Sequence, residues 1–591
     1  MALEDSYVIV ITKSTAVGRI KGHQIYKVIS TEFMPLRERQ LDDPDEKTYL
    51  EYLKLLIKSS PMYFSYSSDI TNTFQRQAEG KLDQPLWQRA DDRFFWNRFV
   101  SSSLIDFREG QASGRLSSGP QPAVDAYILP VMFGMMSITN TSIKGNGMTF
   151  LLITRRSRHR TGTRYLSRGV DASGHVSNYN ETEQAVILND SASSAMTSYA
   201  GDQGFANGKP VGGLETQVLA YVQTRGSVPV FWAEVNNLHY VPSLQIRGVE
   251  AAKDAAAQHF DEQIRLYGEN YLVNLVNQKG REVRVKNAYE EMVHLLQSTP
   301  IEQQEADRKT REKFTVIESG DKRSWYDHLH YVYFDFHNET KGLKWHRAQL
   351  LLDQLKDGLV AGGYFHGIDK PDGSVDVRHK QTAVVRTNCM DCLDRTNVIQ
   401  SMLGRWTLTR QLIDLGLLAP GESAQDDQTF EHLFRNVWAD NADVVSKSYS
   451  GTGALKTDFT RTGNRTRAGA LQDLNNSITR YVRNNFLDGP RQDGFDIFLG
   501  AYQPDGAPIG SGQQFLDRRP LLIQAVPYVL GFCIFFVIVS VTTNRLPDST
   551  VWPLRVFTLC CMGVAAWAGR FMWNYGTLYV SAYPGFRRVS Y

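Results

Sequence analysis

The segment 383–397 constrains the fold of this chain most, because a short apolar run leads through a cysteine and an arginine into a helical pattern. Five residues separate Cys389 from Arg395. The apolar run Ala383–Val385 predicts a buried strand, and three residues separate it from the cysteine. After Arg395 apolar residues recur at helical spacing, so the loop is expected to open onto the first turn of a helix. These apolar residues are Val398, Ile399, Met402, Leu403 and Trp406.

The loop between the predicted strand and helix has the composition of a phosphate-binding site. Free backbone N–H groups at a helix N-terminus bind anions, and the planar fork of Arg395 can hold two phosphate oxygens. The same positive surroundings favour ionisation of Cys389, since a free thiol with a pKa of about 8.5 is mostly protonated at neutral pH. Thr396 can hydrogen-bond the sulfur and ease its departure when water hydrolyses a cysteinyl-phosphate. The segment therefore predicts a cysteine-dependent phosphatase loop.

Two carboxylic acids in the loop are candidates for protonating a leaving hydroxyl group. Asp391 is the preferred proton donor and Asp394 is the alternative. Either side chain can instead be a structural acceptor that fixes the amides of the loop. The remaining loop residues, Met390, Cys392 and Leu393, are predicted to line the substrate site.

The two loop cysteines admit two other interpretations, a C-x-x-C redox pair or half of a zinc site. The zinc site lacks partners, because the other three cysteines lie in the apolar C-terminus. The redox pair leaves Arg395 unexplained. Within a phosphatase loop, Cys392 is expected to pack in the interior or to trap oxidised Cys389 as a disulfide. No metal or other cofactor is expected, because backbone dipoles and Arg395 supply the positive field.

At this loop the chain resembles the Sac-domain (suppressor of actin) phosphoinositide phosphatases, and specifically their membrane-anchored branch. Further blocks that resemble this family follow in order along nearly the whole chain. They are Arg155–Ser157 with Gly162–Tyr165, Asn178 with Glu181–Glu183, Gln223–Pro229 with Phe231–Trp232, Tyr333–His337, and Trp438–Asn441 with Ser450–Thr452 and Ala454–Lys456. The resemblance implies a β-rich N-terminal Sac domain followed by a catalytic domain like that of cysteine phosphatases.

The length of the chain predicts more than one domain, because 591 residues are too many for a single core. The expected fold class is mixed, α+β or α/β. The resemblance, more than any shift in composition, sets the first boundary. The predicted units are an N-terminal Sac subdomain at 1–182, a catalytic domain at 183–505, a linker at 506–520, two transmembrane helices within 521–575 and a cytosolic tail at 576–591.

Local patterns predict several elements within these units. Val8–Ile11 and Tyr26–Ile29 are apolar runs separated by turn residues and predict strands. Residues 249–267 predict a helix, and Tyr331–Phe334 predicts a strand. The segment 488–512 contains repeated Gly, Pro and Asp without apolar periodicity, which predicts a flexible linker.

The C-terminus carries two apolar stretches that predict a membrane anchor. Leu521–Val541 has about twenty residues without a charge, enough to cross a hydrocarbon core of about 30 Å. The second stretch, 556–575, is interrupted by Arg570 and can instead be re-entrant or interfacial. Arginine pairs flank the two stretches, so both ends and the catalytic domain are expected on the cytosolic side, with a lumenal turn between the spans. The pairs are Arg518–Arg519 and Arg587–Arg588.

The distribution of charge is more informative than its total of +2, which identifies no partner. Residues 155–168 contain six arginines and no acid. Four cations beyond the loop are predicted to contact inositol phosphates or the membrane, with structural salt bridges as an equal alternative. These cations are Lys456, Arg461, Arg465 and Arg467.

The resemblance implies an enzyme that removes phosphate from phosphatidylinositol 4-phosphate, and from the 3-phosphate as well. The expected partners are phosphoinositide lipid, an anionic membrane surface and adaptor proteins of the Golgi or endoplasmic reticulum, with no nucleic acid. The expected location is the membrane of those two organelles. Two alternatives are a protein tyrosine phosphatase, which shares the loop chemistry, and a catalytically quiet phosphoinositide-binding adaptor. The presence of Cys389, Arg395 and Thr396 weighs against the adaptor.

Overall fold

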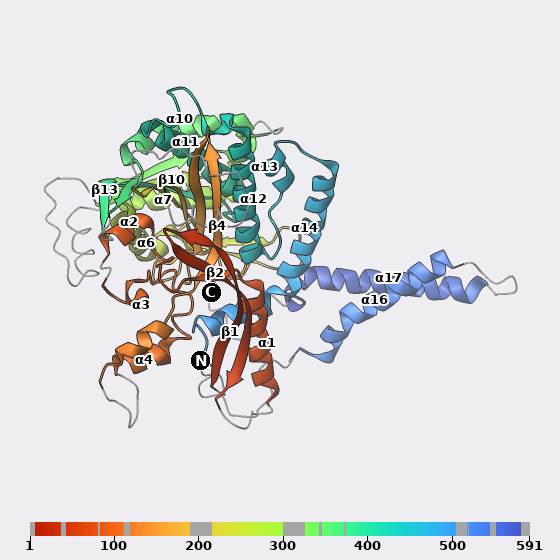
Figure 1. The fold of residues 1–591 in the computed structure, drawn as a ribbon. Helices are drawn as coiled ribbons and strands as arrows, with labels where there is room; N and C mark the ends of the chain where they lie inside the picture. The colour runs from red at the N-terminus through yellow and green to blue at the C-terminus, as the bar shows by residue number, and fades with distance from the viewer. Residues whose placement is uncertain are drawn as a thin grey trace.

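A twelve-stranded sheet runs through the body of the molecule, and helices cover both of its faces (Figure 1). The strand order is β1-β2-β3-β4-β5-β6-β7-β14-β10-β11, with β12 and β13 attached beside β7. This mixed α/β architecture confirms the predicted fold class. The computed structural model describes residues 6–36, 43–80, 83–110, 119–189, 215–298, 325–341, 345–370, 374–503, 517, 519–543 and 551–580.

The N-terminal half of the sheet is antiparallel. Strands β1 (Tyr7–Ile20) and β2 (His23–Pro35) form a hairpin, and the turn residues Lys21 and Gly22 have φ angles of +50° and +82°. Two successive positive φ angles match the twist of the flanking strands, as in type I′ hairpins. The strands predicted at 8–11 and 26–29 are confirmed within these longer strands. The next strands are β3 (Met62–Phe64), β4 (Met132–Ile143), β5 (Asn146–Arg156), β6 (Asn180–Leu188) and β7 (Gln217–Arg225).

The second half of the sheet is parallel where it carries the loop of interest. Strand β14 (Ala383–Asn388) lies between the end of β7 and β10 (Glu269–Asn274), and β11 (Leu329–Tyr333) follows β10. The carboxyl ends of parallel strands meet at one edge of a sheet, where α/β proteins bind their ligands. The strand predicted at 331–334 is confirmed in β11, which begins two residues earlier. The remaining strands are β8 (Trp232–Val235), β9 (Ser243–Ile246), β12 (Phe365–Asp369) and β13 (Val375–His379).

Five helices cover the two faces of the sheet at and beside this parallel part. Helices α10 (Gln349–Gly362), α11 (Asp394–Asp414) and α12 (Gln428–Ser450) pack on one face, and α6 (Lys253–Tyr267) and α7 (Glu282–Gln297) pack on the other. Neighbouring residues of a strand point to opposite faces, so β14 contributes apolar side chains to both layers. The helix predicted at 249–267 is confirmed in α6 and the short 3-10 turn before it.

Helix α15 (Asp488–Phe498) corrects the prediction of a flexible linker beginning at residue 488. It packs against α1 (Pro44–Ser59), although more than 400 residues separate the two helices in the chain. Phe495, Ile497 and Phe498 are buried in this contact. Three apolar residues among Gly, Pro and Asp give no periodicity, so only a distant partner makes this segment a helix. The predicted linker 506–520 lies almost wholly outside the described residues.

The predicted boundary between residues 182 and 183 falls inside β6, whose nine residues pair with both β5 and β7. The sheet is therefore continuous across this point. The division of the chain into units stays a prediction. The other helices are α2 (Phe74–Glu79), α3 (Leu86–Arg89), α4 (Ser102–Glu109), α9 (Phe336–Glu339), α13 (Thr457–Thr462) and α14 (Arg467–Phe486).

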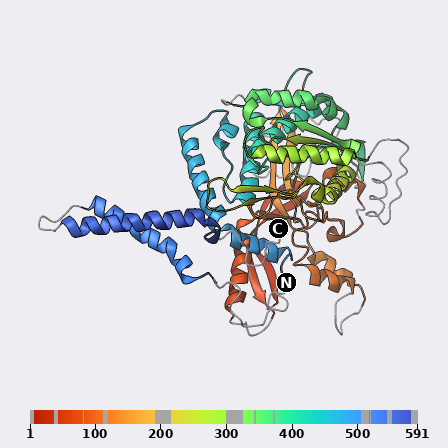
Figure 2. The same cartoon turned by 180° about the vertical axis from the view of Figure 1, so that it is seen from behind.

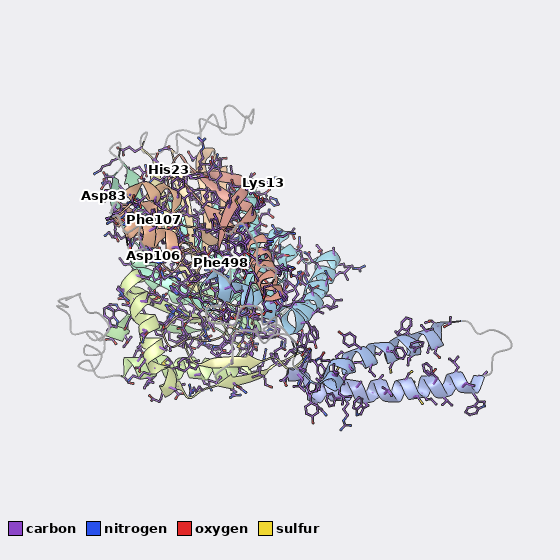
Figure 3. All side chains as sticks on the ribbon, turned by 90° about the horizontal axis from the view of Figure 1, so that it is seen from below. Lys13, His23, Asp83, Asp106, Phe107 and Phe498 are labelled. Atoms are coloured by element: carbon purple, nitrogen blue, oxygen red, sulfur yellow. The ribbon has the colours of Figure 1, made fainter. Side chains whose placement is uncertain are left out.

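Two apolar helices, α16 (Leu521–Thr542) and α17 (Val551–Asn574), project from the body side by side (Figure 3). Both are long and apolar enough to cross a membrane. They contact each other through a hydrogen bond of 2.8 Å between the hydroxyl groups of Ser540 and Thr558. Arg519 donates to the carbonyl of Leu578, so the two ends of the hairpin meet. The arginines at 518, 587 and 588, and residues 581–591 of the predicted tail, lie outside the described residues.

Candidate active site

The loop predicted from the sequence lies at the carboxyl edge of the parallel strands. Strand β14 ends at Asn388, and α11 begins at Asp394, which confirms the predicted order of strand, loop and helix. The loop is enclosed from both sides, because chain leaving β7 and chain leaving β10 contact it. Cys392 donates to the carbonyl of Gly226 after β7, and Arg395 donates to the carbonyl of Leu275 after β10.

The thiol of Cys389 is buried, with 3% of the residue exposed. Its sulfur accepts the backbone N–H of Cys392 at 3.1 Å and the hydroxyl group of Thr396 at 3.6 Å. Hydrogen bonding by Cys392 and the charge of Arg395 lower the pKa of Cys389 to about 6, against the opposing effect of burial. The thiolate is therefore the favoured form at neutral pH.

Cys392 has the opposite electrostatic character. Burial and the neighbouring Cys389 raise its pKa well above the usual value, so it remains a thiol. Its φ of +51° lies in the left-handed region, which costs a non-glycine residue about 1 kcal/mol. This conformation turns the N–H of Cys392 toward the sulfur of Cys389. Met390 and Leu393, predicted to line the substrate site, have side chains buried in separate hydrophobic clusters.

Arg395 is held by a carboxylate that no sequence pattern indicates. Its two terminal nitrogens donate to the two oxygens of Glu282 at 2.9 and 3.0 Å. Burial would lower the pKa of Arg395, but the charges of Cys389 and Glu282 raise it, so the guanidinium stays charged. Glu282 therefore occupies the end of the guanidinium fork, where the two terminal nitrogens lie. Among the described residues no acceptor meets the Nε–H, which leaves the side of the fork available for an oxyanion.

Asp391 is paired with two arginines from the basic segment 155–168. Arg164 and Arg168 approach its carboxylate at 2.7 and 2.6 Å. Burial alone would raise the pKa of Asp391, but the charges and hydrogen bonds of the two arginines hold it well below the usual range. Asp391 is therefore ionised in this arrangement.

Asp394 differs from Asp391 because no arginine pairs with it among the described residues. Its carboxylate accepts the backbone N–H of Leu455 at 3.0 Å. Burial raises the pKa of Asp394, and the charge of Arg480 opposes this only in part. A proton donor must carry its proton before the reaction, so Asp394 has the more suitable environment for that role here.

The sequence did not predict several charged groups near the loop, because their partners are distant in the chain. Arg168 also pairs with Glu234 of β8, and Arg281 pairs with the same carboxylate at 2.7 Å. The one sign of these groups in the sequence was the segment 155–168, which has six arginines and no acid. The carboxylates that neutralise them come from other elements.

Arg225, the last residue of β7, is the most unusual of these groups. It is fully buried, and none of its three guanidinium nitrogens has a hydrogen-bond partner among the described residues. Burial lowers its pKa to about 10, while the nearby Cys392 and Cys389 raise it. A buried cation without a partner is costly, so an anion close to it, such as the thiolate of Cys389, is strongly stabilised.

The four cations predicted beyond the loop are in different situations. Arg461 pairs with Asp440 at 2.7 Å, and Arg465 pairs with Asp458 and Asp473. These two are thus in structural ion pairs, the alternative given for them. The backbone N–H of Lys456 also donates to Asp473, and Arg467 is exposed at the start of α14. The substrate-binding role of all four stays a prediction.

No group of three or more His, Cys, Asp and Glu side chains in the described part of the chain is placed to hold a metal ion. A buried thiol of lowered pKa beside a clamped arginine, at the carboxyl edge of parallel strands, has the features of a phosphate-binding loop.

Comparison with known proteins agrees with this class of site. Residues 1–341 match the SacI homology domain. The chain is 42% identical over 539 residues to phosphatidylinositol-3-phosphatase SAC1 of Saccharomyces cerevisiae, which covers 90% of this chain and 76% of that protein. It is 38% identical over 505 residues to phosphatidylinositol-3-phosphatase SAC1 of Drosophila melanogaster, covering 85% and 73%. It is 34% identical over 512 residues to phosphoinositide phosphatase SAC6 of Arabidopsis thaliana, covering 85% and 74%. The chain belongs to the Sac-domain phosphoinositide phosphatases.

Proposed function

We propose that this chain hydrolyses phosphatidylinositol 4-phosphate and phosphatidylinositol 3-phosphate to phosphatidylinositol, through a cysteinyl-phosphate. The observation that carries the chemistry is the buried thiol of Cys389, whose pKa is lowered to about 6 beside Arg395. The family supplies the substrate class. The yeast and fly relatives are named as phosphatidylinositol-3-phosphatases, which supports the 3-phosphate, and the resemblance to the anchored branch supports the 4-phosphate.

In the first step the thiolate of Cys389 attacks phosphorus in line. A bond between sulfur and phosphorus forms, and the bond from phosphorus to the inositol oxygen breaks. The free side of the Arg395 fork holds two oxygens of the transferring group. A carboxylic acid gives its proton to the leaving oxygen, either Asp391, as the sequence predicts, or Asp394, as its raised pKa favours.

In the second step water attacks the cysteinyl-phosphate. A bond from the water oxygen to phosphorus forms, and a proton of the water passes to the carboxylate that lost its proton in the first step. The bond between phosphorus and sulfur breaks, inorganic phosphate leaves, and the thiolate returns. The hydroxyl group of Thr396 lies 3.6 Å from the sulfur and stabilises the departing thiolate by hydrogen bonding. Loop amides such as the N–H of Cys392 do the same.

We further propose that α16 and α17 anchor the protein in the membranes of the endoplasmic reticulum and Golgi, with the catalytic body in the cytosol. The two ends of the hairpin meet at the body, so both lie on one side of a bilayer. The cysteines are free thiols, which suits a reducing compartment. Because the hairpin is attached to the body, action on its own bilayer is the simpler mode.

Phosphate release from short-chain phosphoinositides by the full chain in lipid nanodiscs, with a chelator present, tests this function. We expect chelator-resistant release from monophosphorylated lipids, lost in Cys389→Ser and retained in Cys561→Ser, the matched change in the anchor. Release that survives in Cys389→Ser would overturn the mechanism. Better turnover of a phosphotyrosine peptide would favour the tyrosine phosphatase, and binding without release would favour the adaptor.

A further inference from the structure

Helix α14 presents apolar side chains to solvent along its whole outward face. Leu471, Leu474, Ile478 and Val482 are 68%, 56%, 57% and 43% exposed, and none belongs to a hydrophobic cluster of the described chain. Residues three and four apart lie on one side of a helix, so these four form a continuous stripe about 17 Å long. We call it the α14 stripe.

The inward face of α14 is polar, which reverses the usual arrangement of a surface helix. The buried residues of this face are Gly469, Arg480 and Asn484. Arg480 donates to the hydroxyl group of Thr452 at 2.9 Å and to the carbonyl of Gly453 at 3.0 Å. A helix on a water-soluble body normally buries its apolar face against that body. The α14 stripe does not, so we expect an apolar environment outside the described chain to cover it.

The position of α14 relates the stripe to the membrane anchor. Figures 1 and 2 show α14 standing across the axis of α16 and α17, on the side of the body from which they leave. The hydroxyl group of Tyr481 donates to the carbonyl of Leu238 at 2.6 Å. The next residue, His239, stacks on Trp573 at the end of α17, with ring centroids 4.3 Å apart. The helix therefore lies beside the point where the anchor enters the bilayer, and nearly parallel to its surface.

The charges on α14 suit an anionic surface. No acidic residue is among the exposed residues of the helix. Its one acid, Asp473, is mostly buried and paired with Arg465. Arg467 is exposed one turn before Leu471, and Arg483 follows Val482 at the other end of the stripe, where its guanidinium donates to the carbonyl of Gly451. Basic residues flanking an apolar face are typical of helices that lie in the interface of a membrane.

We propose that α14 is an interfacial helix, which lies in the headgroup region of the bilayer that the anchor crosses and buries the α14 stripe at the acyl boundary. This proposal rests on the membrane anchoring stated under the proposed function. Contact with the bilayer along α14 fixes the orientation of the catalytic body. The segment held by Arg480 continues to Leu455, whose N–H is bonded to Asp394, so the catalytic loop is held close to the same surface.

Photo-crosslinking in the full chain tests the position of the helix directly. p-Benzoylphenylalanine is placed at residue 474 or 478, and the protein is irradiated in nanodiscs of phosphatidylcholine and phosphatidylserine. Residue 350 is the matched control, since Leu350 is 45% exposed on α10, which lies away from the anchor (Figure 1). We expect lipid adducts by mass spectrometry at 474 and 478 and none at 350. Absence of lipid adducts, or crosslinks to a second copy of this chain or to another protein, would overturn the proposal.

A second measurement gives the consequence for catalysis. The double variant Leu474→Glu with Ile478→Glu should hydrolyse phosphoinositide in its own bilayer about fivefold more slowly. It should hydrolyse a water-soluble short-chain phosphoinositide at the rate of the parent, as should Leu350→Glu on both substrates. Equal loss on both substrates would show a folding defect and contradict the proposal. If the parent hydrolyses neither substrate, the proposed function fails, while the lipid adducts still decide the position of α14.

Discussion

At the scale of single residues, the candidate site is organised around the charge of Cys389. Thr396 and the N–H of Cys392 stabilise the thiolate by hydrogen bonds, and Arg395 and Arg225 supply positive charge from α11 and β7. Arg395 is compensated by Glu282, whereas Arg225 has no hydrogen-bond partner among the described residues. The buried positive charge of Arg225 is therefore the one that the negative charge of the Cys389 thiolate compensates most.

The alkylation rate of Cys389 should rise with pH through about 6 and level off above pH 7, because only the thiolate reacts, and hydrogen bonding by Cys392 and the charge of Arg395 lower its pKa. Arg225→Gln removes a cation and should move this midpoint upward by about one pH unit, while Arg225→Lys should move it less. Iodoacetamide labelling followed by mass spectrometry of the peptide that contains Cys389 measures the profile. An unchanged midpoint in Arg225→Gln would show that Arg225 does not act on the thiolate.

The two loop carboxylates give a second prediction at this scale. Replacing Asp394 with Asn should slow release from a phosphoinositide, a poor leaving group, by about a hundredfold, and should slow release from a nitrophenyl phosphate much less. Asp391→Asn should reduce both rates alike, because it removes the negative charge that pairs with Arg164 and Arg168 beside the loop. The opposite pattern would assign the proton to Asp391, as the sequence predicts.

At the scale of elements, the local sequence pattern accounts for some helices and strands, and tertiary contacts account for others. The order β14, loop, α11 was visible because a buried strand and a buried helix each carry a sustained apolar pattern. Helix α15 carries no such pattern and forms because α1 provides an apolar surface for three of its side chains. At Gly494 an added Cβ would lie 3.1 Å from the carbonyl oxygen of Tyr52, so glycine lets the two helices approach closely.

Phe498→Ala should lower the free energy of unfolding by about 3 kcal/mol, because it leaves a cavity between α15 and α1. Phe107→Ala on α4 is the matched control, since Phe107 is 37% exposed, against 3% for Phe498. Both residues are labelled in Figure 3. Urea unfolding followed by intrinsic fluorescence measures the difference. Equal stability of the two variants would return residues 488–498 to the flexible linker predicted from sequence.

At the scale of the whole molecule, the membrane anchor is in contact with the catalytic body. His239 stacks on Trp573, and an added Cβ at Gly576 would lie 2.0 Å from the carbonyl oxygen of Asn237. The segment at 236–239 follows directly from β8, where Glu234 pairs with Arg168 beside the catalytic loop. The anchor therefore contacts the segment after β8, and β8 in turn contacts an arginine beside the catalytic loop.

Trp573→Ala should loosen this contact and make backbone amides of residues 236–239 exchange with deuterium about tenfold faster, since local opening costs less once the stacking is lost. Trp552→Ala is the matched control, because Trp552 lies at the other end of α17 and is 75% exposed. Exchange measured by mass spectrometry in nanodiscs distinguishes them. Equal exchange in both variants would indicate that the anchor is tethered only through the linker.

Features that depend on local order can be predicted from the sequence alone. The sequence predicts the strand, loop and helix around Cys389 and Arg395, the β-rich beginning and the two apolar C-terminal helices, because each has a period or length readable in a short window. Which charges meet depends on the three-dimensional fold. Glu282, Glu234 and the basic segment 155–168 are far from the loop in sequence, and the sheet brings them together at its carboxyl edge. The same is true of α15 and of the outward apolar face of α14, since burial depends on neighbours that no local pattern contains.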